Sequence, residues 1–204
     1  PRLEGEEMGV DLPGFRGGDR TDIELPAVQR QLLKALKAAG KKVVLINCSG
    51  SPIGLEPETQ SCDAILQAWY PGQAGGQAVA EVLFGDYNPS VRLPVTFYKN
   101  INQLPDFEDY NMAGRTYRYF KGQPLYPFGY GLSYTTFTYG DIQLPASAQT
   151  NETIKVAVSV TNSGPMDGDE IVRLYLKKQG DDEGPVKTLR AFKRVHLPAG
   201  PPVQ

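Results

Sequence analysis

Two short, unbroken runs of aliphatic residues, each adjacent to a helical pattern, set the strongest limit on the fold of this chain. They occupy residues 42–46 and 64–69. Apolar runs of this length that do not alternate with polar residues are typical of strands covered on both faces by helices. We therefore expect an α/β domain with a mostly parallel sheet. Ligands of such sheets bind at the carboxyl ends of the strands, which here are the loops 47–54 and 69–76.

Two helices are predicted beside these runs. The first covers residues 26–39, because Pro26 suits a first helical turn and Gly40 suits the end. The second covers residues 75–84 and ends at Gly85. An apolar stripe is the side that a helix normally buries. In the first helix this stripe consists of Val28, Leu32, Ala35, Leu36 and Ala39.

The pattern changes in the last third of the chain. Residues 153–160 alternate between apolar and polar, and residues 171–176 and 188–197 supply two more strand-like runs. Period-two patterning with turns between the strands is typical of an antiparallel β-sandwich. The prediction is thus an α/β domain at residues 1–135, with its N-terminal part missing, and a β-sandwich at residues 136–204, which we expect to be truncated.

Composition excludes several classes of protein. Lys and Arg number 21 against 23 Asp and Glu, which gives a formal net charge of −2. A nucleic-acid partner is not expected, because binding phosphates needs a basic face. A membrane partner is not expected either, because no apolar run approaches the roughly 18 residues of a membrane span. The opening Pro1-Arg2-Leu3-Glu4 shows no signal-peptide pattern and reads like the middle of a longer protein.

The two cysteines do not form a metal-ligand pattern. Cys48 and Cys62 lack a second pair, and the chain has a single histidine. They are either free buried thiols or one disulfide that closes a short loop. We favour free thiols, because Cys48 ends a predicted buried strand.

Three stretches resemble glycoside hydrolase family 3. Glu4-Gly5-Glu6-Glu7, with Asp19-Arg20 downstream, resembles the acid/base segment of the β-xylosidases and β-glucosidases of that family. Residues 67–76 and 85–94 resemble its second domain, and residues 128–137 resemble the junction before its fibronectin type III-like domain. The three matches occur in the family's order and span nearly the whole chain, so their joint occurrence is specific.

This resemblance implies the C-terminal part of a retaining, exo-acting β-glycosidase that removes terminal β-D-xylosyl or β-D-glucosyl residues from oligosaccharides. It places the general acid/base at the second Glu of the motif, Glu6, with Glu4 and Glu7 as alternatives. It implies no metal and no cofactor, and a periplasmic or secreted protein. The family's nucleophile is an Asp on an upstream (β/α)-barrel domain of the same polypeptide. We therefore expect this chain alone to be inactive.

The chemistry explains why such a residue is a carboxyl. One carboxyl protonates the departing oxygen while a second attacks the anomeric carbon, about 5–5.5 Å away in retaining enzymes. The acid must be protonated near neutral pH, so burial or a neighbouring carboxylate has to raise its pKa. Without the resemblance, the clustered acids of the Glu4–Glu7 motif on a glycine-rich loop would be interpreted as a solvated surface.

Several other residues have two interpretations. In a functional interpretation, Asp19 and Arg20 hold the catalytic loop or touch sugar hydroxyls. In a structural interpretation, they form a salt bridge that fixes the loop to the helix. Trp69 and Tyr70 follow a strand, where they stack on a sugar ring or, more commonly for such a Trp, belong to the core. Val91 stands where the family usually has Gly, and a positive φ there would strain a β-branched residue.

Other chemistries are not supported. The glycines at 72, 75 and 76 match neither a P-loop nor a dinucleotide fingerprint. His196 lies on a predicted surface strand, too isolated for a serine triad. The main alternative to an enzyme is a non-catalytic module that binds carbohydrate or, for the β-sandwich, braces the rest of the protein. An enzyme requires the Glu6 carboxyl in a cleft, whereas a binding module requires an aromatic platform.

Overall fold

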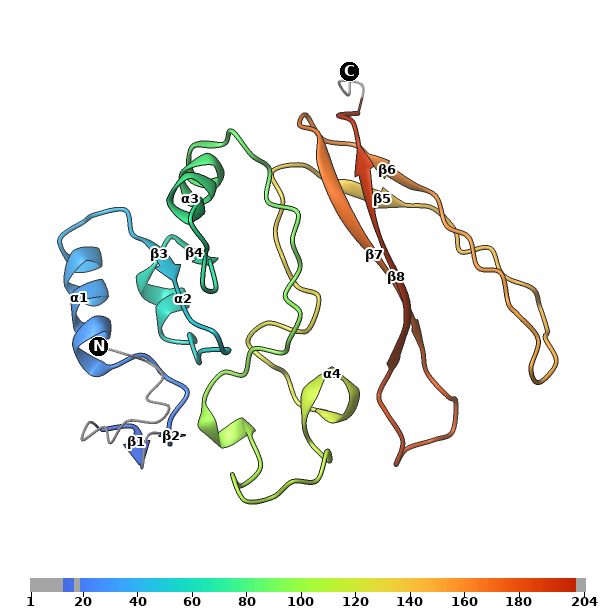
Figure 1. Cartoon of the computed structure of the whole chain (residues 1–204), viewed down its shortest axis with the longest axis horizontal. Helices are drawn as coiled ribbons and strands as arrows, with labels where there is room; N and C mark the ends of the chain where they lie inside the picture. Colours follow the sequence, from blue (N-terminus) through green and yellow to red (C-terminus); the bar gives the residue numbers. More distant parts are fainter. Residues whose placement is uncertain (1–12, 17–18, 201–204) are drawn as a thin grey trace. The chain divides into compact units, whose positions relative to one another are not determined.

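The computed structural model describes residues 13–16 and 19–200, which fall into two units that we treat separately (Figure 1). The first unit comprises Pro1–Val79, Leu93–Tyr130 and Leu176–Thr188. The second unit comprises Ala80–Arg92, Gly131–Tyr175 and Leu189–Gln204.

A parallel pair of strands is the centre of the first unit. β3 (Val44–Asn47) pairs in parallel with β4 (Ala64–Gln67), and the two lie side by side in Figure 1. Helix α1 (Ala27–Ala38) precedes β3, the short helix α2 (Glu58–Ser61) lies between the strands in sequence, and α3 (Gly75–Phe84) follows β4. These elements confirm the predicted α/β class for this region, with boundaries within a few residues of those expected.

The remaining elements of the first unit are short. Before α1, a hairpin forms from β1 (Phe15–Arg16) and β2 (Asp19–Arg20). A 3₁₀ turn, η1, covers Ile101–Gln103, and the one-turn helix α4 covers Thr116–Tyr119. Two-residue strands leave no room for a periodic pattern, so the sequence carried no signal for the hairpin.

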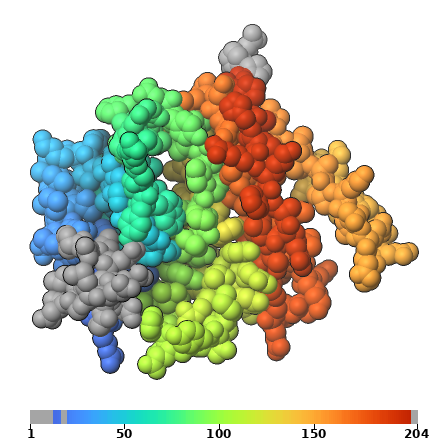
Figure 2. Space-filling model, in the orientation of Figure 1, coloured from blue at the N-terminus to red at the C-terminus, as the bar shows by residue number. Residues whose placement is uncertain are grey.

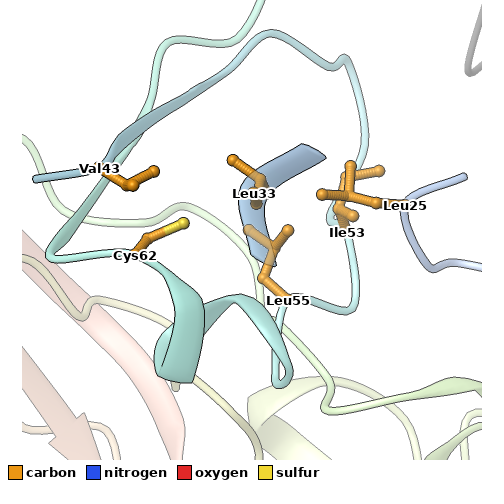
Figure 3. Close-up of a cluster of buried hydrophobic side chains, with 6 residues drawn as sticks. All are labelled: Leu25, Leu33, Val43, Ile53, Leu55 and Cys62. Atoms are coloured by element: carbon orange, nitrogen blue, oxygen red, sulfur yellow. The ribbon is translucent and has the colours of Figure 1, made fainter. Parts of the chain in front are cut away.

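A small apolar cluster holds α1 against the strands. Leu33 of α1 points toward Val43, which precedes β3, and toward Cys62, which follows α2 (Figure 3). Leu45 and Ile65, from the two strands, are partly buried against the cluster. The complete set of buried members is Leu25, Leu33, Val43, Ile53, Leu55 and Cys62.

The predicted buried stripe of α1 is wrong for this chain. Val28 is 65%, Leu32 59% and Leu36 39% exposed, whereas Leu33 on another side of the helix is 9% exposed. Segments of α1 accordingly lie at the molecular surface in Figure 2. The described residues cover the Leu33 side, and the more apolar side remains open to solvent.

β3 shows the same one-sided burial. Val44 and Ile46 are 46% and 38% exposed, while Val43 and Asn47 are buried. Alternate residues of a strand point to opposite faces of the sheet. One face of β3 is therefore covered and the other is not, which corrects the expectation of a strand buried on both faces.

The second unit contains the end of α3, which spans the boundary between the units, and otherwise its regular elements are β-strands. β5 (Phe137–Tyr139) pairs antiparallel with β6 (Val160–Asn162). β7 (Gly168–Leu176) and β8 (Thr188–Leu197) pair with each other and confirm two predicted strands. The predicted strand at 153–160 is mostly irregular.

That irregular stretch lacks cross-strand partners along most of its length. Ile154 and Val156 are 51% and 38% exposed, and Ala157 forms an isolated bridge with Gln143. An alternating pattern makes a strand possible, but the ladder of hydrogen bonds forms only where a second strand lies opposite.

Val91 is not strained. It is 68% exposed, and it is not among the described non-glycine residues with positive φ, which are Trp69, Thr116 and Asn151. The tight position nearby is Gly131, where a Cβ atom would lie 2.6 Å from the carbonyl oxygen of Val91. The close approach that this turn requires is provided by Gly131.

Candidate functional site

The candidate acids Glu4, Glu6 and Glu7 lie outside the described residues. The structure does describe the edge of the sheet that parallel α/β folds use for ligands, at the carboxyl ends of β3 and β4. Both strands end there in polar side chains, and the hairpin that follows the acid segment in sequence binds to the same edge. We therefore describe the candidate site from this edge outward.

A buried polar network joins the ends of the two strands. Asn47 ends β3, and its Nδ2 donates to Oε1 of Gln67, the last residue of β4, at 2.5 Å and to Oγ of Ser49 at 3.0 Å. Gln67 Nε2 donates to the carbonyl oxygen of Ser49 at 3.2 Å. Asn47 is 3% and Ser49 0% exposed. Satisfied networks of this kind fix the positions of their members, because breaking one bond leaves a buried polar group unpaired.

Arg20 connects the hairpin to this network. Its Nη1 donates to Oγ of Ser51 at 2.9 Å, and its Nε donates to the carbonyl oxygen of Asp22 at 3.1 Å. Ser51 is in turn held by Ser49, whose Oγ donates to the carbonyl oxygen of Ser51 at 2.8 Å. These contacts join β2 to the loop after β3, whereas the predicted catalytic loop lies outside the described residues.

A hollow of about 300 Å³ opens beside Arg20. Its accessible lining is almost entirely apolar, although Arg20 and Ser51 border it. Its lining residues are Arg20, Ile23, Ser51, Pro52, Tyr98 and Leu104.

Tyr98, one of the lining residues, is held firmly in place. Its hydroxyl accepts a hydrogen bond from the backbone N–H of Thr116 at 2.7 Å, and its ring packs edge-on against Phe120 at 5.1 Å between centroids. Burial raises the pKa of Tyr98 above its ordinary value. Thr116 has a φ of 58°, which is strained for a β-branched residue and is a feature that clusters at functional sites.

The aromatic pair after β4 divides between the core and the surface. Trp69 has a φ of 57°, and its ring packs edge-on against the buried Phe97 at 6.1 Å between centroids. Tyr70 is 62% exposed. The contact with Phe97 favours the core interpretation of Trp69, and Tyr70 is the member of the pair that remains accessible to a ligand.

A partly buried ionic cluster, which sequence reasoning missed, joins α1 to the buried Glu58 of α2. Arg30 forms salt bridges with Glu24 and Glu58, and its Nε lies 2.8 Å from Oε1 of Glu58. The side chain of Glu58 is 1% exposed. Burial opposes the charge of Arg30, but the hydrogen bonds that it donates to Glu58 and Glu24, together with their negative charges, outweigh burial and raise the pKa of Arg30. The sequence held no signal of this burial, because Glu58 lies in a polar stretch.

Other candidate residues are accounted for. Cys48 and Cys62 are free, which confirms the thiol interpretation, although Cys48 is exposed rather than buried. His196 lies on β8, and its Nδ1 is 2.7 Å from Oδ1 of Asp169. Within residues 13–16 and 19–200, no group of three His, Cys, Asp or Glu side chains is arranged to hold a metal ion. In the same part of the chain, no helix is long and apolar enough to cross a membrane.

Comparison with known protein families gives a match over most of the chain. Residues 1–134 match the glycosyl hydrolase family 3 C-terminal domain. This range includes the acid segment and the whole edge described above.

Two curated relatives align along almost the whole chain. A xylan 1,4-β-xylosidase of Xylanibacter ruminicola is 62% identical over 200 residues, which is 98% of this chain and 23% of that protein. A periplasmic β-glucosidase of Salmonella typhimurium is 41% identical over 210 residues, covering 96% of this chain and 27% of its own length. The chain thus spans about a quarter of the length of these relatives.

Solved structures give the same result. A β-glucosidase from Erythrobacter marinus superposes with a TM-score of 0.78 at 42% identity, covering 90% of this chain and 25% of that chain. A β-glucosidase from Listeria innocua in complex with isofagomine superposes with a TM-score of 0.77 at 32% identity, covering 90% of this chain and 28% of the other.

Proposed function

This chain belongs to glycosyl hydrolase family 3 through the C-terminal domain of that family, and on this basis we propose that it supplies the general acid/base of a retaining β-glycosidase. The observation that carries the proposal is the family match over residues 1–134, a range that includes both the Glu4–Glu7 motif and Arg20. Glu6 is the proposed acid/base, and Glu4 and Glu7 are the alternatives.

The proposed reaction needs two carboxyl groups, and this chain provides one. In the first step Glu6 gives its proton to the glycosidic oxygen while a carboxylate from an upstream (β/α)-barrel domain forms a bond to the anomeric carbon. In the second step the ionised Glu6 removes a proton from water, which displaces the enzyme carboxylate. The net configuration at the anomeric carbon is retained.

The proposed substrates are oligosaccharides with a terminal β-D-xylosyl or β-D-glucosyl residue. The names of the relatives support both sugars, and the relative at 62% identity is a xylan 1,4-β-xylosidase. We place the enzyme in the periplasm or outside the cell, as the name of the Salmonella relative suggests. The second unit is proposed to be a fibronectin type III-like β-sandwich that braces the enzyme.

The exposed apolar surface supports the need for further polypeptide. Val28, Leu32 and Leu36 of α1 and Val44 and Ile46 of β3 are all more than a third exposed. Apolar side chains that gather on one side of a helix and one face of a strand usually meet another element. The relatives are about four times longer than this chain and have the additional sequence to supply it.

The proposal is tested in a chimera in which this chain replaces its matching segment in the Xylanibacter ruminicola protein. Glu6→Gln is compared with Glu4→Gln and Glu7→Gln, using xylobiose and 2,4-dinitrophenyl β-xyloside. Dinitrophenolate leaves without protonation, whereas a sugar alkoxide does not. We expect Glu6→Gln to lower kcat/KM for xylobiose by roughly 10²–10⁴-fold and to leave kcat/KM for the aryl xyloside within about tenfold.

A second readout identifies the base in the deglycosylation step. Azide needs no general base, so it should restore kcat of Glu6→Gln on the aryl xyloside and give a xylosyl azide product. The same signature in Glu4→Gln or Glu7→Gln would move the assignment to that residue. Two outcomes would reject the proposed function and leave the carbohydrate-binding alternative. One is a folded chimera without activity, and the other is that all three variants keep full activity on both substrates.

A further inference from the structure

We propose that Arg20 positions the segment that carries the general acid, by tying the hairpin β1–β2 to the loop after β3. This inference rests on the proposed function, because it concerns the same proton-transfer step. Arg20 is a positioning residue in this scheme, since it acts through the acid segment rather than on the sugar.

The hairpin is the structure nearest in sequence to the acid segment. Residues 1–12 lead directly into Pro13 and β1. The backbone N–H of Thr21 donates to the carbonyl oxygen of Gly14 at 2.8 Å and closes the base of the hairpin. A shift of the hairpin therefore moves Pro13, the point at which residues 1–12 join the described chain.

Toward the described residues, the guanidinium of Arg20 donates hydrogen bonds in two different directions. One goes to Oγ of Ser51 at 2.9 Å, and the other goes to the carbonyl oxygen of Asp22 at 3.1 Å. The planar fork of an arginine can make both bonds at once, whereas a lysine ammonium on a flexible stem cannot hold the same geometry. The pair of bonds defines where β2 lies relative to the loop after β3.

The point that Arg20 binds is rigid. The carbonyl oxygen of Ser51 accepts a hydrogen bond from Ser49, and Ser49 accepts one from Asn47, which also binds Gln67 at the end of β4. Asn47 and Ser49 are almost completely buried. Because moving these groups would leave buried polar atoms unpaired, the hairpin is attached to a fixed part of the sheet.

The chain after Arg20 is attached independently of its side chain. The backbone N–H of Gly54 donates to the carbonyl oxygen of Ile23 at 2.8 Å, and Glu24 forms a parallel bridge with Gly54. Arg30 binds Glu24 and the carbonyl oxygen of Gly54 as well. Loss of the Arg20 side chain should therefore loosen the hairpin without detaching the segment behind it.

A loosened hairpin has a specific chemical consequence. Misplacement of a catalytic group by about 1 Å can cost roughly 10²-fold in rate. The cost falls on the substrate whose leaving group needs the proton, and a substrate that leaves unprotonated is spared. A purely structural defect, such as partial unfolding, would lower both activities equally.

The test compares Arg20→Met with Arg16→Met in the same chimera. Arg16 lies on β1 of the same hairpin and is exposed, so its replacement is a matched control. We expect Arg20→Met to lower kcat/KM for xylobiose by roughly 10–100-fold and to change kcat/KM for the aryl xyloside by less than about threefold. Arg20→Lys should give an intermediate loss, and Ser51→Ala a smaller loss with the same substrate dependence.

Two outcomes would overturn the inference. One is an equal loss on both substrates, which indicates a structural role; the other is a change in Arg20→Met no larger than that in Arg16→Met. The result is separable from the proposed function, because Glu6→Gln tests that function alone. If Glu6→Gln discriminates between the substrates and Arg20→Met does not, the acid assignment stands and the role of Arg20 is rejected.

Discussion

Helix α1 has two sides that behave in opposite ways. One side carries Arg30, Leu33 and Lys37, whose partners are Glu58 and Glu24, the apolar cluster and Asp63. The other side carries Val28, Leu32 and Leu36, which are 65%, 59% and 39% exposed. The side with two cations is thus the one that packs within this chain, and the fully apolar side faces solvent.

This difference shows that amphipathicity alone does not tell which side of a helix a given chain covers. Arg30 packs inward because Glu58 and Glu24 match its charge, so the desolvated guanidinium is compensated. The apolar stripe is left uncovered by the described residues, and the relatives are about four times as long as this chain. The packed side can therefore be tested in this chain alone, and the apolar side in a longer polypeptide.

The largest effect should come from Arg30. Arg30→Met leaves Glu58, with a side chain 1% exposed, buried without a countercharge. We expect the free energy of unfolding to fall by roughly 3–5 kcal/mol, the usual cost of removing one partner of a buried pair. Urea unfolding of the chain measures this value.

Gln31→Met serves as the control, because Gln31 is an exposed neighbour on α1. It should change the free energy of unfolding by no more than about 0.5 kcal/mol. A loss below about 1 kcal/mol in Arg30→Met would mean that the packed side of the helix does not depend on its ion pairs.

The next largest loss of stability should come from Leu33, for which the adjacent Leu32 serves as the comparison. Leu33→Ala removes a side chain that is 9% exposed, and we expect a loss of about 2–5 kcal/mol in the free energy of unfolding. Leu32→Ala removes one that is 59% exposed and should cost no more than about 0.5 kcal/mol in this chain. Thermal and urea unfolding of the two variants give the comparison directly.

The same pair sharpens the comparison in the chimera with the Xylanibacter ruminicola protein. If upstream sequence covers the apolar side, Leu32→Ala should become costly there, by about 1 kcal/mol or more. An unchanged, negligible cost in the chimera would show that the apolar side stays exposed in the larger protein too.

Sequence reasoning succeeded where a pattern repeats over several residues. The parallel strands β3 and β4, helix α3 and strand β8 follow from aliphatic runs, helix end signals and alternation. It failed where burial depends on a distant partner. Glu58 is buried because Arg30 lies opposite, and no local pattern in its polar stretch contains that information.

The candidate site divides in the same way. The loops after β3 and β4 were expected to form a ligand edge, and the structure places Asn47, Ser49 and Gln67 there in one network. Arg20 was singled out from its place in a motif, but its bond to Ser51 was not foreseen. This contact joins residues 31 positions apart and depends on how the hairpin folds back on the sheet. Strands of two residues are too short to show a sequence pattern from which that fold could be predicted.

The smallest effect concerns Asp63, which binds the packed side of α1. The backbone N–H of Val43 donates to Asp63, and together with Lys37 it lowers the pKa of this carboxyl to about 2, from a reference of 3.8. A lowered pKa in the folded state means that the contribution to stability is complete above pH 3.8. It is lost as the pH falls through about 2, where the folded form also takes up a proton.

Asp63→Asn should therefore remove part of the acid dependence of the urea midpoint between these two pH values and leave the slope above pH 5 unchanged. An NMR titration of the Asp63 carboxyl checks the premise, and a midpoint near pH 4 would show that the end of α1 is not held at Asp63. Lys41→Met, on an exposed lysine with no contact to Asp63 among the described ion pairs, should leave this titration in place, whereas Lys37→Met should raise its midpoint.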